Sequence, residues 1–253
     1  MPEKIVGEAY EGVCWSRCEK DRDSCSRNGI GKLLSDDPGR GDCRICPEDR
    51  GKTNAGALYN LGILYYEGDG VEQDYEKAVE YFQQAADQGF PDAQNNLGVA
   101  YYYGTGVEQD YEKSFEYTRL AAEQGVPEAL YNLGRDYQYG EGVEQDYDKA
   151  MEYYQLAADQ GFGLALNNIG DLYENGYGVE QDYEKALEYY NAAIEAGDPY
   201  GYWSLGTLYE KGHGVEQDYD KAAEYYQTAA NLGVQEAVED LDRMIEEGLV
   251  EAE

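Results

Sequence analysis

The sequence predicts an all-α protein in which five helix–turn–helix repeats stack into a solenoid. Three observations support this fold class: a segment repeated at fixed spacing, two helical patterns of apolar residues in each repeat, and capping and turn residues between them. The segment Gly-Val-Glu-Gln-Asp-Tyr recurs every 36 residues, starting at Gly70, Gly106, Gly142, Gly178 and Gly214. A fixed period of this length is typical of repeat arrays.

The first half of each repeat has the pattern of an amphipathic helix. In the first repeat, Ala57, Leu61, Leu64 and Tyr65 fall at i, i+4, i+7 and i+8, on one helical face. A glycine recurs within this helix, at Gly62, Gly98, Gly134, Gly170 and Gly206. Glycine costs about 1 kcal/mol relative to alanine inside a helix. We therefore expect a neighbouring helix to approach closely at this position.

The second half predicts another amphipathic helix with clear start and stop signals. Asp74 is suited to cap its first turn, because its carboxylate can accept hydrogen bonds from free backbone N–H groups. The apolar face comprises Ala78, Tyr81, Phe82, Ala85 and Ala86. Gly89 and Pro91 end the helix. The turn between the two helices, at 68–71, contains two glycines that can adopt positive φ.

The sequence divides into three parts. These are a cysteine-bearing segment at 1–52, five repeats at 53–233, and a capping helix with a short tail at 234–253. Neither helix of a repeat can bury its apolar face alone, so the repeats must stack. The capping helix is expected from Glu236 to Glu247, with an apolar face made of Ala237, Val238, Leu241, Met244 and Ile245. It would cover the last hairpin and keep the outer side polar.

The repeated residues resemble a known family. Each repeat combines Ala-x-x-x-Leu-Gly-x-x-Tyr, Gly-x-Gly-Val-x-x-Asp, Lys-Ala and Tyr-x-x-Ala-Ala-x-x-Gly, with departures at Ser114, Gly163 and Gly201. This pattern resembles the Sel1-like repeat, a relative of the tetratricopeptide repeat with a longer turn between its helices. The resemblance covers most of the chain and recurs five times in register. It implies a right-handed α-solenoid that serves as a non-enzymatic adaptor or scaffold.

The net charge of −34 is concentrated in the repeats. Of 19 basic and 53 acidic residues, 10 and 11 lie in residues 1–53, which leaves 9 basic and 42 acidic residues, a net charge of −33. Such a surface repels phosphate groups, so nucleic acids and anionic membranes are not expected partners. A cationic segment of another protein fits better. The alternative is that the charge only keeps a monomeric array soluble.

The family resemblance also suggests where a partner binds. In the tetratricopeptide fold, the first helix of each hairpin lines a concave groove, and its inward positions vary here while the packing positions do not. The predicted partner-binding residues are Tyr59, Tyr66, Asn95, Tyr102, Tyr103, Tyr131, Arg135, Tyr139, Asn167 and Trp203. Aromatic side chains offer large, stiff contact areas with a polar tip. They suit an extended peptide with apolar anchors and flanking Lys or Arg.

A column of asparagines lies one residue further along the first helices, at Asn60, Asn96, Asn132 and Asn168. An amide group both donates and accepts, so the column could hold the backbone of an extended peptide. Alternatively, each Asn ties its own hairpin to the next, which would explain why these positions do not vary.

All five cysteines precede the repeats. Cys14, Cys18, Cys43 and Cys46 form two close pairs that can supply four thiolates to a structural zinc ion. The stretch between the pairs has little to build a core, so a metal or a cross-link would help it fold. Disulfides and free thiols are the alternatives, and Cys25 is a further candidate ligand. A zinc-dependent or redox-responsive regulator is therefore the second functional hypothesis.

An enzyme finds little support in the sequence. The only histidine, His213, falls in a turn, which leaves a Ser–His–Asp or Cys–His arrangement unsupported within the repeats. Some secreted Sel1-like proteins are described as penicillin-binding or β-lactamase-like. The chain has no Ser-x-x-Lys motif, however, and Lys52-Thr53-Asn54 only approximates Lys-Thr-Gly. We therefore expect no enzymatic activity.

The sequence contains no apolar run of about 18 residues, so it predicts no membrane-spanning helix. Residues 1–8 lead into no apolar stretch of the kind found in secretory signals, and a cytoplasmic location is expected. A chain whose signal had been removed would look the same.

Overall fold

The structure, a computed structural model, describes residues 54–251. By its internal contacts the chain divides into two units, 1–53 and 54–253, and the described residues belong to the second. These residues form eleven α-helices and contain no strand. The cysteine-bearing segment lies outside them.

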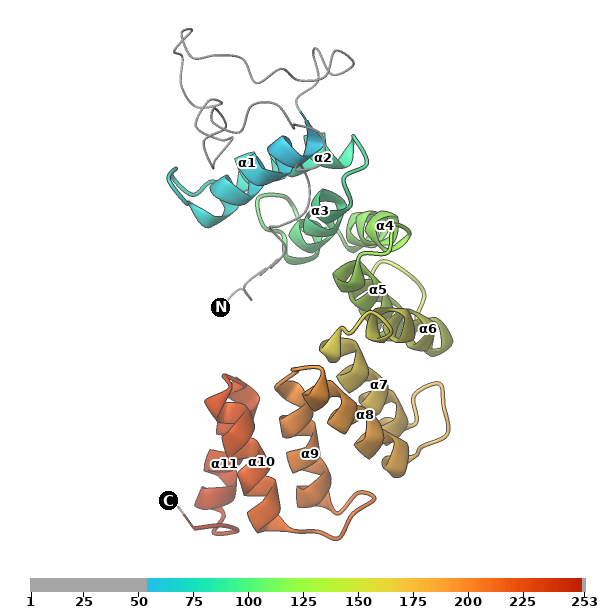
Figure 1. Cartoon of the computed structure of the whole chain (residues 1–253), viewed down its shortest axis with the longest axis vertical. Coiled ribbons are helices and arrows are strands. Elements are labelled where there is room, and N and C mark those ends of the chain that lie inside the picture. The colour runs from blue at the N-terminus through green and yellow to red at the C-terminus, as the bar shows by residue number, and fades with distance from the viewer. Residues whose placement is uncertain (1–53, 252–253) are drawn as a thin grey trace, which may run out of the picture. The chain divides into compact units, whose positions relative to one another are not determined.

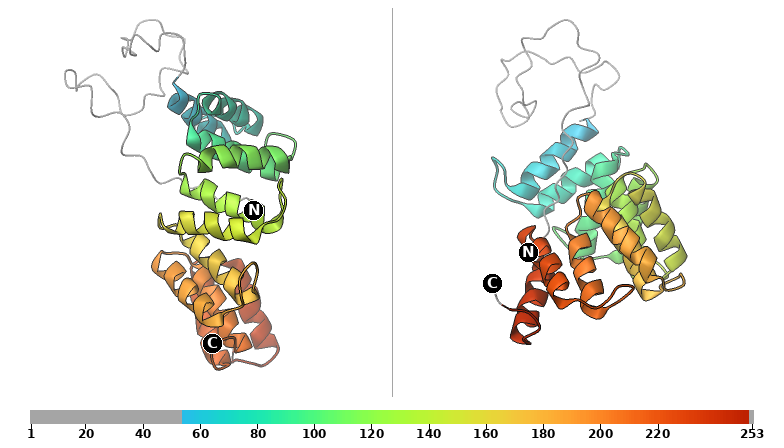
Figure 2. Two further views of the ribbon diagram at one scale, coloured as in Figure 1. Left: turned by 90° about the vertical axis from the view of Figure 1, so that its right-hand side faces the viewer. Right: turned by 60° about the horizontal axis from the view of Figure 1, so that its bottom comes forward.

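The helices alternate between the first and the second helix of each repeat (Figure 1). The first helices are α1 (Ala55–Glu67), α3 (Pro91–Tyr103), α5 (Pro127–Tyr139), α7 (Gly163–Asn175) and α9 (Tyr200–Lys211). The second helices are α2 (Tyr75–Ala86), α4 (Tyr111–Ala122), α6 (Tyr147–Ala158), α8 (Tyr183–Glu195) and α10 (Tyr219–Asn231), and α11 (Gln235–Glu246) follows. Each helix packs against the next along the series, in an order that Figure 2 shows from two other directions. The predicted α-solenoid with a capping helix is confirmed.

Local sequence signals explain the helix boundaries. The Oδ1 atom of Asp74 accepts a hydrogen bond from the backbone nitrogen of Lys77 at 3.0 Å, as predicted for the cap of the second helix. The same contact recurs at Asp110, Asp146, Asp182 and Asp218. The first helix α1 ends at Gly68, whose φ of 75° reverses the chain direction. The fixed caps explain why all five hairpins have nearly the same length.

The glycine inside each first helix lies where the second helix of the same hairpin crosses it. A Cβ atom at Gly134 would lie 2.6 Å from the ring of Tyr154, and one at Gly170 would lie 2.4 Å from the ring of Tyr190. The corresponding neighbours are Phe82 for Gly62, Thr118 for Gly98 and Tyr226 for Gly206. These distances are far below van der Waals contact, so the predicted close approach of a neighbouring helix is confirmed.

The glycine that opens the repeated Gly-Val-Glu-Gln-Asp-Tyr segment packs against the preceding repeat. A Cβ atom at Gly142 would lie 2.0 Å from the backbone oxygen of Tyr111, in the first turn of α4. Gly106, Gly178 and Gly214 meet the equivalent residues Tyr75, Tyr147 and Tyr183. Gly70 of the first repeat has nothing within 4 Å among the described residues. The repeated segment is therefore tied to the stacking of neighbouring hairpins.

The core lies where the hairpins stack. Leu97 and Leu133, in the second and third repeats, are almost fully buried, in agreement with the predicted apolar face. The first repeat differs from the prediction, because Leu58 is buried whereas Ala57 and Leu64 are only half-buried. No described hairpin precedes α1, so the side of α1 that faces away from α3 has no stacking partner among the described residues.

Helix α11 covers the last hairpin. Ala237 and Met244 are fully buried in one hydrophobic cluster with Ala222 and Tyr226 of α10, and Leu241 packs against this cluster. The helix begins and ends one residue earlier than the sequence predicts.

Candidate functional site

The predicted partner-binding residues lie on the first helices of the repeats. The surface that α1, α3, α5, α7 and α9 share is called the first-helix face below. Direct packing joins α7 to α9. Hydrogen bonds from Asn132 to Asn95 and from Arg135 to Tyr102 join α3 to α5. The sequence therefore places these side chains on neighbouring elements, but their burial differs widely from one to the next.

Two tyrosines of this face are largely exposed. Tyr103 ends α3 and is 57% exposed, and Tyr139 ends α5 at the equivalent position and is 59% exposed. The ring of Tyr102 lies beside Tyr103, with centroids 4.8 Å apart, and 5.3 Å from that of Tyr111. Repeats two and three thus present aromatic area to solvent, and such area is well suited to contact another protein.

Arg135 lies among these tyrosines and connects the second and third repeats. Its Nη2 donates a hydrogen bond to the Tyr102 hydroxyl at 3.3 Å, and its guanidinium carbon lies 5.4 Å from the ring centroid of Tyr102. The Tyr102 hydroxyl in turn donates to Oε1 of Glu141 at 3.0 Å. Burial and this hydrogen bond raise the pKa of Tyr102 to about 12. The network holds a positive charge on an array in which acidic residues outnumber basic ones by 42 to 9.

Asp136 is a feature of this region that the sequence analysis missed. It occupies a position that is apolar in the other repeats, at Leu64, Ala100, Leu172 and Leu208. Its side chain is 4% exposed, and its Oδ2 has no hydrogen-bond partner among the described residues. Burial, reinforced by nearby Glu141 and opposed by Arg135, raises the pKa of Asp136 to about 7. A break in the repeated apolar pattern was the signal that could have identified it.

Two of the predicted partner-binding tyrosines pack within their own hairpins. The ring centroid of Tyr59 lies 5.8 Å from that of Phe82 and 5.1 Å from that of Phe90. The centroid of Tyr131 lies 5.8 Å from that of Tyr154 and 5.2 Å from that of Phe162. The interpretation that these positions take no part in packing is therefore wrong for Tyr59 and Tyr131. Each ring packs on the second helix of its hairpin and on the phenylalanine that precedes the next first helix.

Asn95 and Asn167 are buried rather than open to a partner. Asn132 of the next repeat donates to Oδ1 of Asn95 at 3.4 Å, and the Ser204 hydroxyl donates to Oδ1 of Asn167 at 2.9 Å. Asn168 donates to the Tyr154 hydroxyl of the preceding repeat at 3.0 Å. These bonds favour the alternative in which the asparagine column ties neighbouring hairpins together.

Tyr66 and Trp203 are half-buried at the two ends of the array. The ring of Tyr66 meets that of Tyr75 edge to face, with centroids 5.1 Å apart. The indole Nε1 of Trp203 donates to Oδ2 of Asp240 in α11 at 2.8 Å. Trp203 therefore helps to attach the capping helix, and its role in partner binding stays a prediction.

The fourth repeat carries a second polar cluster on the first-helix face. The Tyr190 hydroxyl lies 2.7 Å from Oδ1 of Asp171 and 2.7 Å from Oε2 of Glu174. A single hydroxyl hydrogen serves one carboxylate at a time. Burial raises the pKa of Asp171 to about 7, so a proton on this carboxyl would allow both bonds to form. Oε1 of Glu174 lies 3.8 Å from the Lys211 amino group and 3.3 Å from Nδ1 of His213.

His213, in the turn between α9 and α10, contacts the preceding repeat. Its ring stacks on Tyr183 of the preceding repeat at 4.6 Å, besides its contact with Glu174. Among the described residues, no group of three His, Cys, Asp or Glu side chains is placed to hold a metal ion. The predicted zinc ligands fall in the part of the chain that is not described. Nor does any described helix have the length and apolar character needed to cross a membrane.

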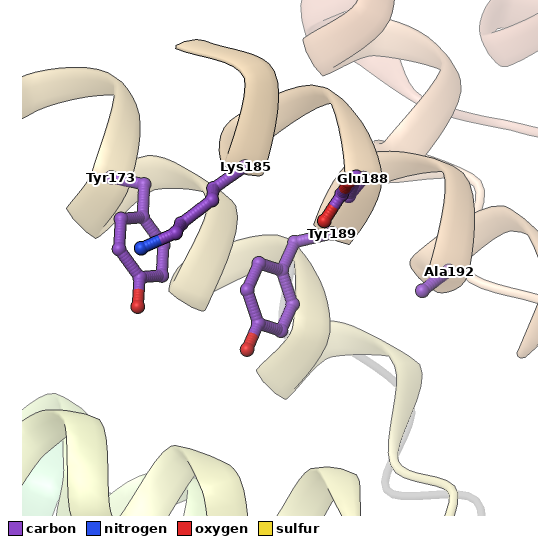
Figure 3. A pocket seen from close by; sticks show the side chains of 5 residues that line it. All are labelled: Tyr173, Lys185, Glu188, Tyr189 and Ala192. Carbon is purple, nitrogen blue, oxygen red and sulfur yellow. The ribbon is translucent and has the colours of Figure 1, made fainter. Parts of the chain in front are cut away.

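The lysine–tyrosine stacks between the two helices of each hairpin, together with the exposed side chains of the second helices, are called the outer face below. The stack between α7 and α8 lines a pocket of about 300 Å³. Figure 3 shows it lined by Tyr173, Lys185, Glu188, Tyr189 and Ala192, with the lysine beside the tyrosine rings. The rings of Tyr173 and Tyr189 stack at 5.6 Å, and the Lys185 amino group lies 4.8 Å from the Tyr173 centroid. The same stack with a lysine recurs in the other repeats, at Tyr65, Tyr101, Tyr137 and Tyr209. We therefore regard it as part of the repeat framework.

Comparison with known proteins agrees with this architecture. A Sel1 repeat protein from Oxalobacter formigenes is 38% identical, with a TM-score of 0.68 over 76% of this chain and 78% of that one. The protective antigen c5321 of uropathogenic Escherichia coli, which displays an SLR fold, is 39% identical, with a TM-score of 0.64 over 78% of this chain. The aligned part is only 42% of that protein. Immunity protein Pa5087 from Pseudomonas aeruginosa is 27% identical, with a TM-score of 0.52, over 77% of this chain and 69% of its own. No curated protein matches the chain.

The repeat boundaries agree as well. The family model of the Sel1 repeat matches five consecutive segments, at 55–90, 91–126, 127–162, 163–198 and 199–234. Each segment contains one hairpin, and each boundary falls between the second helix of one repeat and the first helix of the next. With the glycine contacts and aspartate caps repeated in every hairpin, the chain belongs to the Sel1 repeat family.

Proposed function

We propose that the chain is a non-enzymatic scaffold that binds an extended, basic-flanked segment of another protein along the first-helix face. The observation that carries this proposal is the exposure of Tyr103 and Tyr139 at equivalent positions of neighbouring repeats. The other repeats have Glu67, Asn175 and Lys211 at this position. Repeats two and three thus present aromatic anchors that the packing of the array does not require.

The family supports the general part of this proposal. Sel1 repeat proteins are generally scaffolds for protein–protein interaction and are generally not enzymes. One structural neighbour is an immunity protein. A partner for this chain is therefore expected to be a protein or a peptide.

Residue variation favours the first-helix face over the outer face. The lysine–tyrosine stacks of the outer face recur in all five repeats, so they cannot distinguish one part of a partner from another. On the first-helix face, the position of Arg135 holds Ile63, Val99, Asp171 and Thr207 in the other repeats. A surface with a different side chain in each repeat can recognise a particular sequence.

Charge favours a partner segment with Lys or Arg. Residues 54–253 contain 42 acidic and 9 basic residues, a net charge of −33. Complementary charge mainly accelerates association and selects between partners. Aromatic anchors in repeats two and three would supply most of the binding free energy.

The proposal predicts that replacing Tyr103 and Tyr139 together with alanine weakens partner binding by at least about 2 kcal/mol, or roughly 30-fold. The partner is first captured from cell extract by the immobilised full chain, identified by mass spectrometry and purified. Its affinity is then measured by calorimetry. Tyr102 is kept intact, because its hydroxyl holds Arg135 and Glu141 in place.

The matched control removes side chains of similar exposure from the second helices. Leu120 and Leu156 are 37% and 43% exposed on α4 and α6. Their double replacement with alanine is expected to leave the affinity within about twofold, since surface substitutions away from a contact have small effects. Equal affinity of the tyrosine variant and the parent, or a larger loss in the leucine variant, would exclude the first-helix face as the binding surface.

A further inference from the structure

Arg135 differs from the other arginines of the described residues in having no ion pair. Arg119 contacts Glu123, and Arg243 lies 2.8 Å from Glu210 and 3.0 Å from Asp240. No described carboxylate lies within 4.0 Å of the Arg135 guanidinium, although 42 of the 51 charged Lys, Arg, Asp and Glu residues in 54–253 are acidic. In so acidic an array, an arginine without an ion pair needs an explanation.

The surroundings of Arg135 leave most of its donors unused. A guanidinium carries five N–H donors, and the structure gives this one a single hydrogen bond, to the Tyr102 hydroxyl. Its other close neighbours among the described residues are tyrosines and Asp136. Its charge interacts with the hydroxyls of Tyr131, Tyr103 and Tyr139 and with the carboxyl of Asp136. Tyrosine rings shield the guanidinium from water on their side without neutralising its charge.

The contact with Tyr102 also fixes the side chain. The same hydroxyl that accepts from Arg135 donates to Glu141, so the negative charge of Glu141 balances Arg135 only through an intervening hydroxyl. The stacking of Arg135 over the Tyr102 ring adds a second restraint. A guanidinium held in this way is ready to bind a planar anion, because little of its freedom is left to lose.

We propose that Arg135 binds a carboxylate of the partner segment, namely an Asp or Glu side chain flanked by basic residues. This inference rests on the proposed function and specifies one residue of the partner. An arginine and a carboxylate can form two parallel charge-assisted hydrogen bonds, which add geometric specificity to binding free energy. A phosphate group suits the site less well, because its larger negative charge would be repelled by the surrounding array.

The position of Arg135 favours a side chain over the C-terminus of the partner. Arg135 lies in the third of five repeats, with α1 and α3 before it and α7 and α9 after it. An extended segment that follows the first-helix face continues past Arg135 in both directions. A C-terminal carboxylate at this point would leave half of the face without a partner.

The test uses the full chain and three fluorescent peptides of twelve residues, composed of Lys, Leu, Pro and Ser apart from the sixth residue. Two are blocked at both ends and differ only at the sixth residue, which is Asp in one and Asn in the other. The third has Asn at that residue and a free C-terminal carboxylate. Fluorescence anisotropy is expected to show the Asp peptide binding about tenfold more tightly than the Asn peptide, the size of one net charge-assisted interaction.

Variants then assign the effect to Arg135. Arg135→Gln, and Arg135→Thr, which copies Thr207 of the fifth repeat, should bind the blocked Asp and Asn peptides with equal affinity. Arg119→Gln, on α4, should keep the full preference for Asp. Circular dichroism checks that each variant keeps its helices.

Several results would overturn the inference. Equal affinity of the parent for the Asp and Asn peptides would show that Arg135 does not bind a carboxylate. The proposal that the first-helix face binds a partner would not be affected. If both Arg135 variants still preferred the Asp peptide, a residue other than Arg135 would bind its carboxylate. If the peptide with the free C-terminal carboxylate bound more tightly than the peptide with the internal Asp, the ligand of Arg135 would be a chain end and not a side chain. Failure of all three peptides to bind would also reject the site, whereas the Tyr103 and Tyr139 variant tests the face itself.

Discussion

Replacing Leu133 with alanine is expected to lower the free energy of unfolding by about 2–5 kcal/mol, as truncation of buried leucines generally does. Leu133 lies in α5 with 1% of its side chain exposed, within a cluster that includes Ala157 and Ile169. The lost methyl groups leave a cavity that rigid helices on both sides fill only in part. Because each repeat contacts only its neighbours, the third repeat and those beside it should lose the most stability.

The same chemical change at Leu156 is the control for this prediction. Leu156 lies on the second helix of the same repeat and is 43% exposed. Its replacement with alanine should change the free energy of unfolding by no more than about 0.5 kcal/mol. Urea denaturation followed by circular dichroism measures both. Equal losses in the two variants would show that the helical register assigned to α5 is wrong.

Replacing Asp136 with leucine is expected to stabilise the protein, and to do so more at high pH than at low pH. The folded pKa of Asp136 is about 7, above the value of about 3.9 for an unfolded Asp. A proton is therefore bound more tightly in the folded state. This contribution to stability is fully present below about pH 4 and is lost as pH rises through 7. Three pKa units correspond to about 4 kcal/mol at most.

Melting temperatures of the parent, Asp136→Leu and Asp136→Asn at pH 5 and pH 8.5 check this expectation. Glu141 and Arg135 face the carboxyl and are unchanged in all three proteins. Asp171 and Asp198, whose pKa values burial also raises, contribute equally to each. The melting temperature of the leucine variant should exceed that of the parent by more at pH 8.5 than at pH 5. The asparagine variant should likewise lack the part of the parent's pH dependence that comes from the titration of Asp136. A difference between parent and leucine variant that is the same at both pH values would contradict the account.

The repeat architecture could be predicted from the sequence because its signals are local and occur five times. Asp74 caps its helix through a backbone contact three residues away, and Gly62 can only be glycine where Phe82 crosses it. Each such signal depends on one hairpin or on its immediate neighbour. Repetition then separates the positions that the fold requires from those that are free to vary.

The candidate site was harder to predict because burial at the first-helix face depends on tertiary contacts, both within a repeat and between repeats. The helical pattern treats Tyr131 and Tyr139 alike, yet the first packs against Phe162 and the second is 59% exposed. Asn95 is buried because Asn132 of the next repeat reaches it. Positions that recur do not reveal Asp136, because this residue departs from the apolar pattern of its repeat.

The most direct test of the central claim, that the first-helix face binds the partner, is photo-crosslinking from single positions of the full chain. Benzoylphenylalanine replaces Tyr139 in one variant and Leu156 in another, which places the same reactive group on α5 and on α6 of one repeat. Both native side chains are exposed, so neither replacement should disturb folding. If the first-helix face binds the partner, the purified partner should crosslink to position 139 and not to position 156. Crosslinking at position 156 alone would place the partner on the outer face and contradict the account.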